Sequence, residues 1–124
     1  QKLEKKVKNK KKEISELLKK IKSQKKSIIA YGASDRGTVF MNYCNITNKE
    51  INFVVDKNDQ KIGYLSPGIN LRIKNISQLY KVKPDYVLLN AWNFKDEILK
   101  QFKNNGLKTK IILPFPEVKI IKNY

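Results

Sequence analysis

The clearest indication of the fold is the segment Ser27-Ile-Ile-Ala-Tyr31, which is followed directly by Gly32-Ala-Ser-Asp-Arg-Gly37. A short apolar run that ends in glycine is typical of a buried strand entering a tight turn. The apolar residues that follow predict a helix from Thr38 to about Asn45. A buried strand joined to a helix by a glycine-containing turn is the repeating unit of parallel α/β sheets.

The rest of the chain repeats this alternation. Apolar runs and helical spacing predict strands at 51–55, 71–73, 86–89 and 111–113, and helices at 76–80 and 94–104. Residues 57–70 are rich in turn formers, and Asn105-Gly106 is a typical helix C-cap. Strands alternating with helices form a parallel sheet with right-handed crossovers. The sequence therefore predicts a small Rossmann-like three-layer α/β domain over residues 27–124, with a mostly parallel sheet.

A basic amphipathic helix is expected over residues 1–26, as a connector ahead of this domain. Apolar residues recur there at helical spacing, and the segment holds 12 Lys against three Glu. The apolar stripe is interrupted at Lys10 and Lys11, which predicts first turns that fray or face solvent. We expect the helix to pack on its own domain or to link to a preceding one. A membrane-surface role is less favoured, because the helix has no Trp or Phe anchor.

Length and cysteine content set further bounds. At 124 residues the chain has the size of one domain. It opens at Gln1 and not at Met, so we expect a fragment of something longer. No apolar run is long enough to cross a bilayer, and no signal peptide is recognisable. The single cysteine, Cys44, is expected in the core and not as a nucleophile, and it fits a reducing compartment, most simply the cytoplasm.

Composition argues against several classes of site. The chain has no histidine, which removes the commonest general base and the commonest metal ligand, so we predict neither a catalytic nor a metal site. The net charge of +16 is typical of nucleic-acid-binding proteins, but the excess of basic residues is almost entirely Lys. Arginine, which reads phosphates and guanines in bidentate fashion, is limited to Arg36 and Arg72. These features favour a solvated surface, with nucleic acid as the weaker alternative.

The loop after the first strand is the first candidate binding element. As a dinucleotide fingerprint it supplies Gly32, Ser34 and Gly37, with serine in place of the middle glycine. Gly32 would make the turn, Gly37 would allow close helix–strand packing, and Arg36 would add a cation. The helix N–H groups above this loop suit a phosphate. Ser34 weakens a dinucleotide interpretation, and a plain strand–helix turn remains an alternative.

Two further candidates follow later strands. Asp56 ends the second strand about twenty residues after the loop, where a carboxylate typically accepts ribose hydroxyls, although it could equally cap the next turn. Asn90 and Trp92 follow the strand at 86–89 and are expected either to contact a sugar or base or to belong to the core. For Asn93 a cap of the next helix is favoured. All of these residues lie at expected carboxyl ends of strands.

Together these motifs resemble a known family. They occur in the order Gly32-Ala-x-x-Arg-Gly37, Asn42-Tyr43-Cys44, Val55-Asp-Lys-Asn58, Lys61-x-Gly63, Pro67-Gly68, Pro84-Asp-Tyr86, Ala91-Trp-Asn93 and Pro114-x-Pro116. The ordered set resembles the C-terminal domain of S-adenosylmethionine-dependent C-methyltransferases that act on nucleotide-linked deoxysugars. That family usually has Lys in place of Arg36, so the cation is kept. The resemblance covers about residues 12–121.

The resemblance implies a nucleotide-sugar-binding domain whose partner is the preceding methyltransferase domain of the same parent chain. S-adenosylmethionine and the catalytic residues would belong to that central domain, so this chain would bind no cofactor and would not be catalytic alone. The implied ligand-binding positions are Gly32, Ser34, Arg36, Gly37, Asp56, Lys61, Asn90, Trp92 and Asn93. The alternatives are a module binding NAD or another nucleotide, and a polyanion binder acting through the Lys-rich helix.

Overall fold

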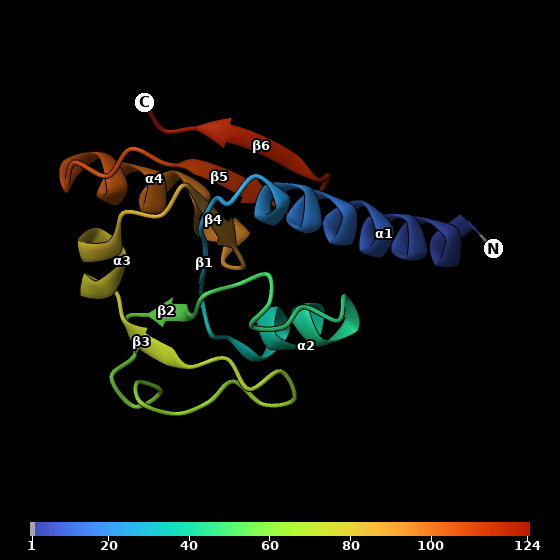
Figure 1. Ribbon diagram of the computed structural model, residues 1–124, viewed down its shortest axis with the longest axis horizontal. Coiled ribbons are helices and arrows are strands. Elements are labelled where there is room, and N and C mark those ends of the chain that lie inside the picture. Colours follow the sequence, from blue (N-terminus) through green and yellow to red (C-terminus); the bar gives the residue numbers. More distant parts are fainter. Residues whose placement is uncertain (1) are drawn as a thin grey trace.

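The computed structural model describes residues 2–124, with side chains from Lys5 onward (Figure 1). Its elements are α1 (Lys2–Ser23), β1 (Ile28–Tyr31), α2 (Asp35–Tyr43), β2 (Val54–Asp56), β3 (Ile73–Asn75), α3 (Ser77–Val82), β4 (Tyr86–Leu89), the 3-10 helix η1 (Trp92–Phe94), α4 (Lys95–Asn104), β5 (Lys110–Leu113) and β6 (Lys119–Lys122). The strands form one sheet in the order β3-β2-β1-β4-β5-β6. The predicted Rossmann-like α/β fold is therefore confirmed.

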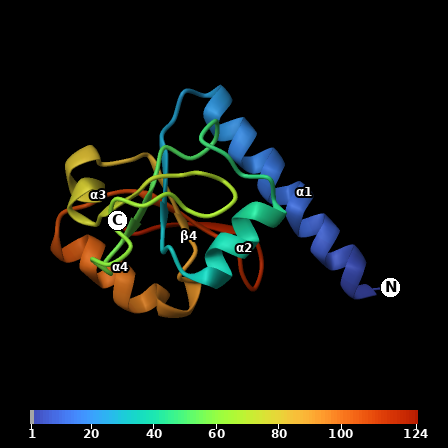
Figure 2. The same cartoon turned by 90° about the horizontal axis from the view of Figure 1, so that it is seen from below.

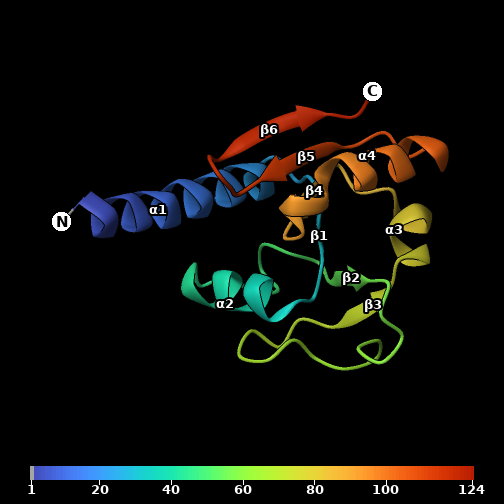
Figure 3. The ribbon, with the colours of Figure 1, turned by 180° about the vertical axis from the view of Figure 1, so that it is seen from behind.

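The sheet is parallel from β3 to β5, and β6 joins β5 antiparallel. The strand order reverses between β1 and β4, so the carboxyl ends of these two strands form the topological switch point, where ligands bind in this class of sheet. β6 was not predicted. Its Lys-Ile-Ile-Lys sequence carries only two apolar residues at the outer edge of the sheet (Figure 3), which gives a weak periodic signal.

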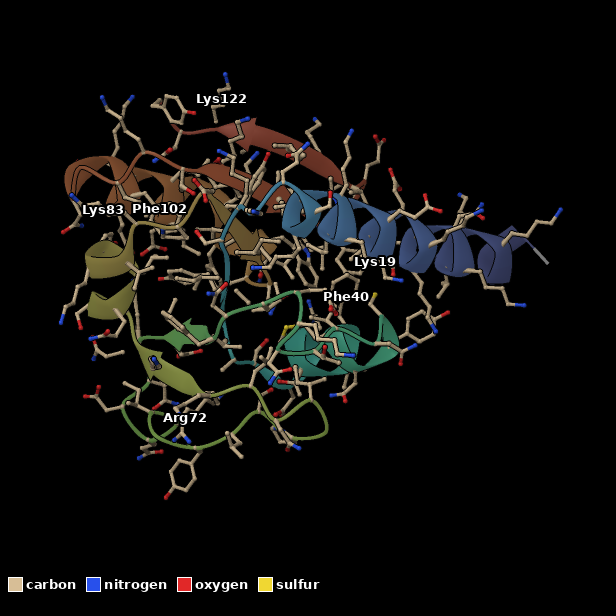
Figure 4. All side chains as sticks on the ribbon, in the orientation of Figure 1. Lys19, Phe40, Arg72, Lys83, Phe102 and Lys122 are labelled. Atoms are coloured by element: carbon tan, nitrogen blue, oxygen red, sulfur yellow. The ribbon has the colours of Figure 1, made fainter. Side chains whose placement is uncertain are left out.

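Helices cover both faces of the sheet (Figure 2). α1 and α2 lie on one face, over a core that includes Ile14, Leu18 and Met41. α3 and α4 lie on the other, over a core centred on Phe102, which is fully buried. Figure 4 shows Phe40 and Phe102 on these two different faces. The three layers follow from the burial of β1, whose four residues are all buried, because each face of such a strand needs a helical cover.

α1 is one continuous helix through Lys10 and Lys11 and does not fray there, but its exposed residues 5–9 confirm the alternative prediction, that the first turns face solvent. Its second half packs on the sheet, while residues 5–9 are exposed and that end extends beyond the sheet (Figure 2). Lys10 is half-buried instead of solvated: its Nζ donates hydrogen bonds to the carbonyl oxygens of Pro114, at 2.7 Å, and Pro116, at 2.9 Å. No helix within residues 2–124 has the length and apolar character needed to span a membrane.

Candidate functional site

The Gly32–Gly37 loop connects β1 to α2 at the switch point. Gly32 adopts φ +109°, a conformation that side-chain-bearing residues rarely take. Ser34 is the N-cap of α2, and its hydroxyl accepts a hydrogen bond from the Gly37 N–H at 3.2 Å. Ser34, in the place of the fingerprint's middle glycine, therefore has a defined role as a helix cap.

Asp56, at the end of β2, links this loop to β2 by a hydrogen bond. One carboxylate oxygen accepts a hydrogen bond from the Ala33 N–H at 2.7 Å, and the other accepts one from the Asn58 N–H at 2.8 Å. The predicted turn-capping role is thus present, and the bond to Ala33 adds a contact that the sequence did not indicate. Lys61 reaches the same loop, because its Nζ donates to the Ala33 carbonyl oxygen at 2.9 Å.

The Asn90 side chain contacts the Gly32–Gly37 loop from its buried side. Its side chain is 2% exposed, and Nδ2 donates to the Gly32 carbonyl oxygen at 3.2 Å. The side chain fills the space beside Gly37, where an added Cβ would lie 2.8 Å from the Asn90 Cβ. Its Oδ1 accepts no hydrogen bond from the described residues. Asn90 and Gly37 therefore help to hold the loop in its conformation, through a hydrogen bond to Gly32 and close packing on the buried side.

Asn93 does not cap α4, so that prediction is wrong. The chain first makes the turn of 3-10 helix at Trp92–Phe94, and α4 then begins at Lys95. This extra turn places Phe94 at the N-cap position, where no side chain bonds the helix terminus. Asn93 is exposed. The predicted C-cap at the other end of α4 is confirmed: Asn105 is the cap, and Gly106 follows with φ +69°.

Six of the nine predicted site residues line three clefts around the loop, and Gly37, Asn90 and Asn93 line none of these clefts. Gly32, Ser34 and Asp56 line a cleft of about 350 Å³, which we call the β2–β4 cleft. Arg36 and Trp92 line a cleft of about 550 Å³ between α1 and α2, the α1–α2 cleft. A third cleft, of about 630 Å³, is lined by Lys61 and the loop after β2. The structure thus brings together two subsets of the predicted residues and places Lys61 in a different cleft, although its Nζ bonds the same loop.

The α1–α2 cleft is lined by several residues that were not predicted to belong to a site. Phe115 is one of them, with ring-centroid distances of 4.4 Å to Trp92 and 5.2 Å to Phe40. Lys10 Nζ lies 3.8 Å from the centroid of the Phe115 ring, and Lys11 Nζ lies 5.0 Å from that of Tyr43. The motifs Asn42-Tyr43-Cys44 and Pro114-x-Pro116 mark two walls of this cleft, but their spacing alone gave no indication that they meet.

Burial changes the ionisation of the groups near these clefts. Desolvation raises the pKa of the Cys44 thiol to about 11, and the side chain is 3% exposed. Desolvation likewise raises the pKa of Tyr31, a residue that lines the β2–β4 cleft. Partial burial lowers the pKa of Lys10. Cys44 is therefore a protonated core residue, as predicted, and not an activated nucleophile.

Comparison with known proteins agrees with this architecture. A model of the C-methyltransferase C-terminal domain family matches residues 1–116. The chain is 34% identical, over 112 residues, to "C-methyltransferase NovU" of Streptomyces niveus. That alignment covers 88% of this chain and 26% of the relative, so the chain spans about a quarter of the relative's length. A match of this extent, over a Rossmann-like fold with its loops at the switch point, shows that the chain belongs to the C-methyltransferase C-terminal domain family.

Proposed function

We propose that this chain is the nucleotide-sugar-binding domain of a sugar C-methyltransferase, and that its ligand binds at the carboxyl edge of β1 and β4. One observation carries the proposal: the Gly32–Gly37 loop, Asp56 and the Asn90–Trp92 segment meet around the point where the strand order reverses. Sheets of this type bind nucleotides in the crevice outside that point. Three segments far apart in sequence thus converge where the fold favours a ligand.

The chemistry of this edge suits a nucleoside diphosphate bonded to a sugar. The N-terminus of α2 presents backbone N–H groups, and Arg36 in its first turn adds a positive charge. The β2–β4 cleft holds the carboxylates of Asp56 and Glu97, which can accept hydrogen bonds from hydroxyl groups. An anionic end and a hydroxyl-binding end are the two features that a nucleotide-sugar requires.

Under this proposal the methyl donor and the reacting groups lie in another part of the parent enzyme. Cys44 and Tyr31, whose pKa values burial raises, stay protonated at neutral pH, which suits packing better than acid–base chemistry. The chain's own residues would bind and orient the substrate, leaving S-adenosylmethionine to the preceding methyltransferase domain. The proposed compartment, the cytoplasm, is where such sugar nucleotides would be used.

Thermal unfolding of the chain with and without ligands tests this function. We expect dTDP, UDP or GDP to raise Tm in a saturable way, and NAD and S-adenosylmethionine to leave it unchanged. A ligand at ten times its Kd stabilises the folded state by about 1.4 kcal/mol. For a domain of this size that corresponds to a rise of roughly 4–6 °C.

The two arginines provide a matched pair of variants. Arg36→Ala is expected to weaken nucleoside diphosphate binding about ten-fold, because it removes a charged partner of the phosphates. Arg72→Ala removes the same charge at the β3 side of the molecule (Figure 4), outside all three clefts, and is expected to change affinity less than two-fold. Equal effects of the two variants, or stabilisation by NAD alone, would contradict the proposal.

A further inference from the structure

We propose that the α1–α2 cleft is the subsite for the base and phosphates of the nucleotide, with the base against its aromatic wall and the phosphates toward Arg36. This inference rests on the proposed function and deepens it. It assigns the anionic half of the ligand to the side of α2 that faces α1. The β2–β4 cleft is then left for the hydroxyl-bearing half.

The cleft has the size and surface of a site for a planar group. Its volume of about 550 Å³ is typical of small-molecule sites. Its wall is built from the rings of Phe40, Tyr43, Trp92 and Phe115, contributed by α2, η1 and the segment after β5. Aromatic side chains stack on nucleobases of every type, because every base has a π-face. Trp92 and Phe115 follow β4 and β5, so this wall lies at the carboxyl edge of the sheet.

The charges around the cleft select for an anion. Among the residues from Lys5 onward, its lining includes the cations Lys6, Lys10, Lys11 and Arg36 and no carboxylate. The β2–β4 cleft has the opposite balance, because its lining includes Asp56 and Glu97 with Lys57 as its one cation. A diphosphate is therefore attracted to the first cleft and repelled from the second, since like charges at close range cost free energy.

Arg36 connects the cleft to the Gly32–Gly37 loop. It lies in the first turn of α2, two residues after the Ser34 cap, and its guanidinium carbon lies 5.8 Å from the centroid of the Trp92 ring. A phosphate held at the N-terminus of α2 and a base lying on Trp92 would thus be separated by about the length of the Arg36 side chain. This distance is within the span of a nucleoside monophosphate.

Contacts within the chain hold the aromatic wall. Lys10 crosses from α1 to the carbonyl oxygens of Pro114 and Pro116, which fixes the segment that carries Phe115. Phe40, which is 8% exposed, packs on Phe115 with the rings edge to face. A wall whose rotamers are already fixed loses little side-chain entropy when a base stacks on it.

A pair of charge substitutions at Val39 tests the inference. Val39 lines the α1–α2 cleft and is 67% exposed, so neither a glutamate nor a lysine there disturbs the core. With dTDP as the probe, we expect Val39→Glu to weaken binding about five- to ten-fold and Val39→Lys to leave it equal or tighter. The same pair at Val82, which is 46% exposed on the opposite face, is the control, and both changes there are expected to stay within two-fold.

The fluorescence of Trp92, the single tryptophan of the chain, gives an independent measurement on the unmodified protein. We expect dTDP to change its emission saturably, and pyrophosphate, which has no base, to bind more weakly with little change in emission. If dTDP stabilises the chain but neither the emission nor the charge at Val39 affects the titration, the α1–α2 subsite is wrong and the proposed function still stands. If dTDP does not bind at all, both fail.

Discussion

Asp56→Ala is expected to lower the free energy of unfolding by about 2–3 kcal/mol, since each hydrogen bond to a charged group contributes roughly 1.5–3 kcal/mol and this carboxylate is partly exposed. The substitution would leave the N–H groups of Ala33 and Asn58 without their acceptor. The first of these lies in the Gly32–Gly37 loop, so the loss would loosen the loop from β2. Urea unfolding followed by circular dichroism measures the change.

Two further variants separate this effect from a simple loss of charge. Asp56→Asn keeps one oxygen that can accept one of the two hydrogen bonds, and we expect it to cost about half as much as alanine. Asp59→Ala removes an exposed carboxylate three residues away and is expected to change stability by less than about 0.5 kcal/mol. An Asp56→Ala protein as stable as the Asp59→Ala protein would show that the two hydrogen bonds do not hold the loop.

Gly37→Ala is expected to destabilise the domain by about 1–3 kcal/mol, the usual cost of overpacking. The new Cβ would lie 2.8 Å from the Asn90 Cβ, closer than real side chains approach, and both Gly37 and Asn90 are buried. The sign is informative, because glycine-to-alanine changes inside an uncrowded helix stabilise by up to about 1 kcal/mol. A stabilised Gly37→Ala protein would mean that α2 does not lie this close to the end of β4.

The double variant Gly37→Ala/Asn90→Gly measures the contact itself. Removing the Asn90 Cβ relieves the clash, so we expect the double variant to be more stable than the sum of the two single changes predicts. A coupling of about 1 kcal/mol would fall in the range found for residues in contact. Additive effects would place the cost of Gly37→Ala elsewhere.

The fold could be predicted because its strands are buried and separated by turn formers. β1, β4 and β5 were predicted within one residue, since each is a continuous apolar run between polar residues. β2 and β3 begin two to three residues later than predicted. Ile51 and Leu71 are buried although they precede the paired residues, and burial alone produces the apolar signal. β6 was not predicted, because an exposed edge strand shows little alternation of apolar and polar residues.

The site was predictable only where it follows strand ends. The loop at Gly32–Gly37 and Asp56 lie together as expected, because parallel strands end at one edge. The wall formed by Lys10 and Phe115 was missed, since these residues are more than a hundred positions apart and only tertiary packing joins them. Asn93 was misjudged because a 3-10 turn, which leaves no clear sequence signal, delays the start of α4.

Chemical-shift mapping by NMR is the decisive test of nucleotide binding at the carboxyl edge of β1 and β4, because it locates the nucleotide on the chain without any substitution. The labelled chain is titrated with dTDP at moderate salt. We expect saturable shifts of the backbone amides from Ser34 to Gly37 and of the Trp92 indole N–H, with little change at lysines of α1 outside the α1–α2 cleft, such as Lys19 (Figure 4). Shifts spread over the outer face of α1 and abolished by salt would contradict this expectation, and would identify non-specific attraction to a basic helix.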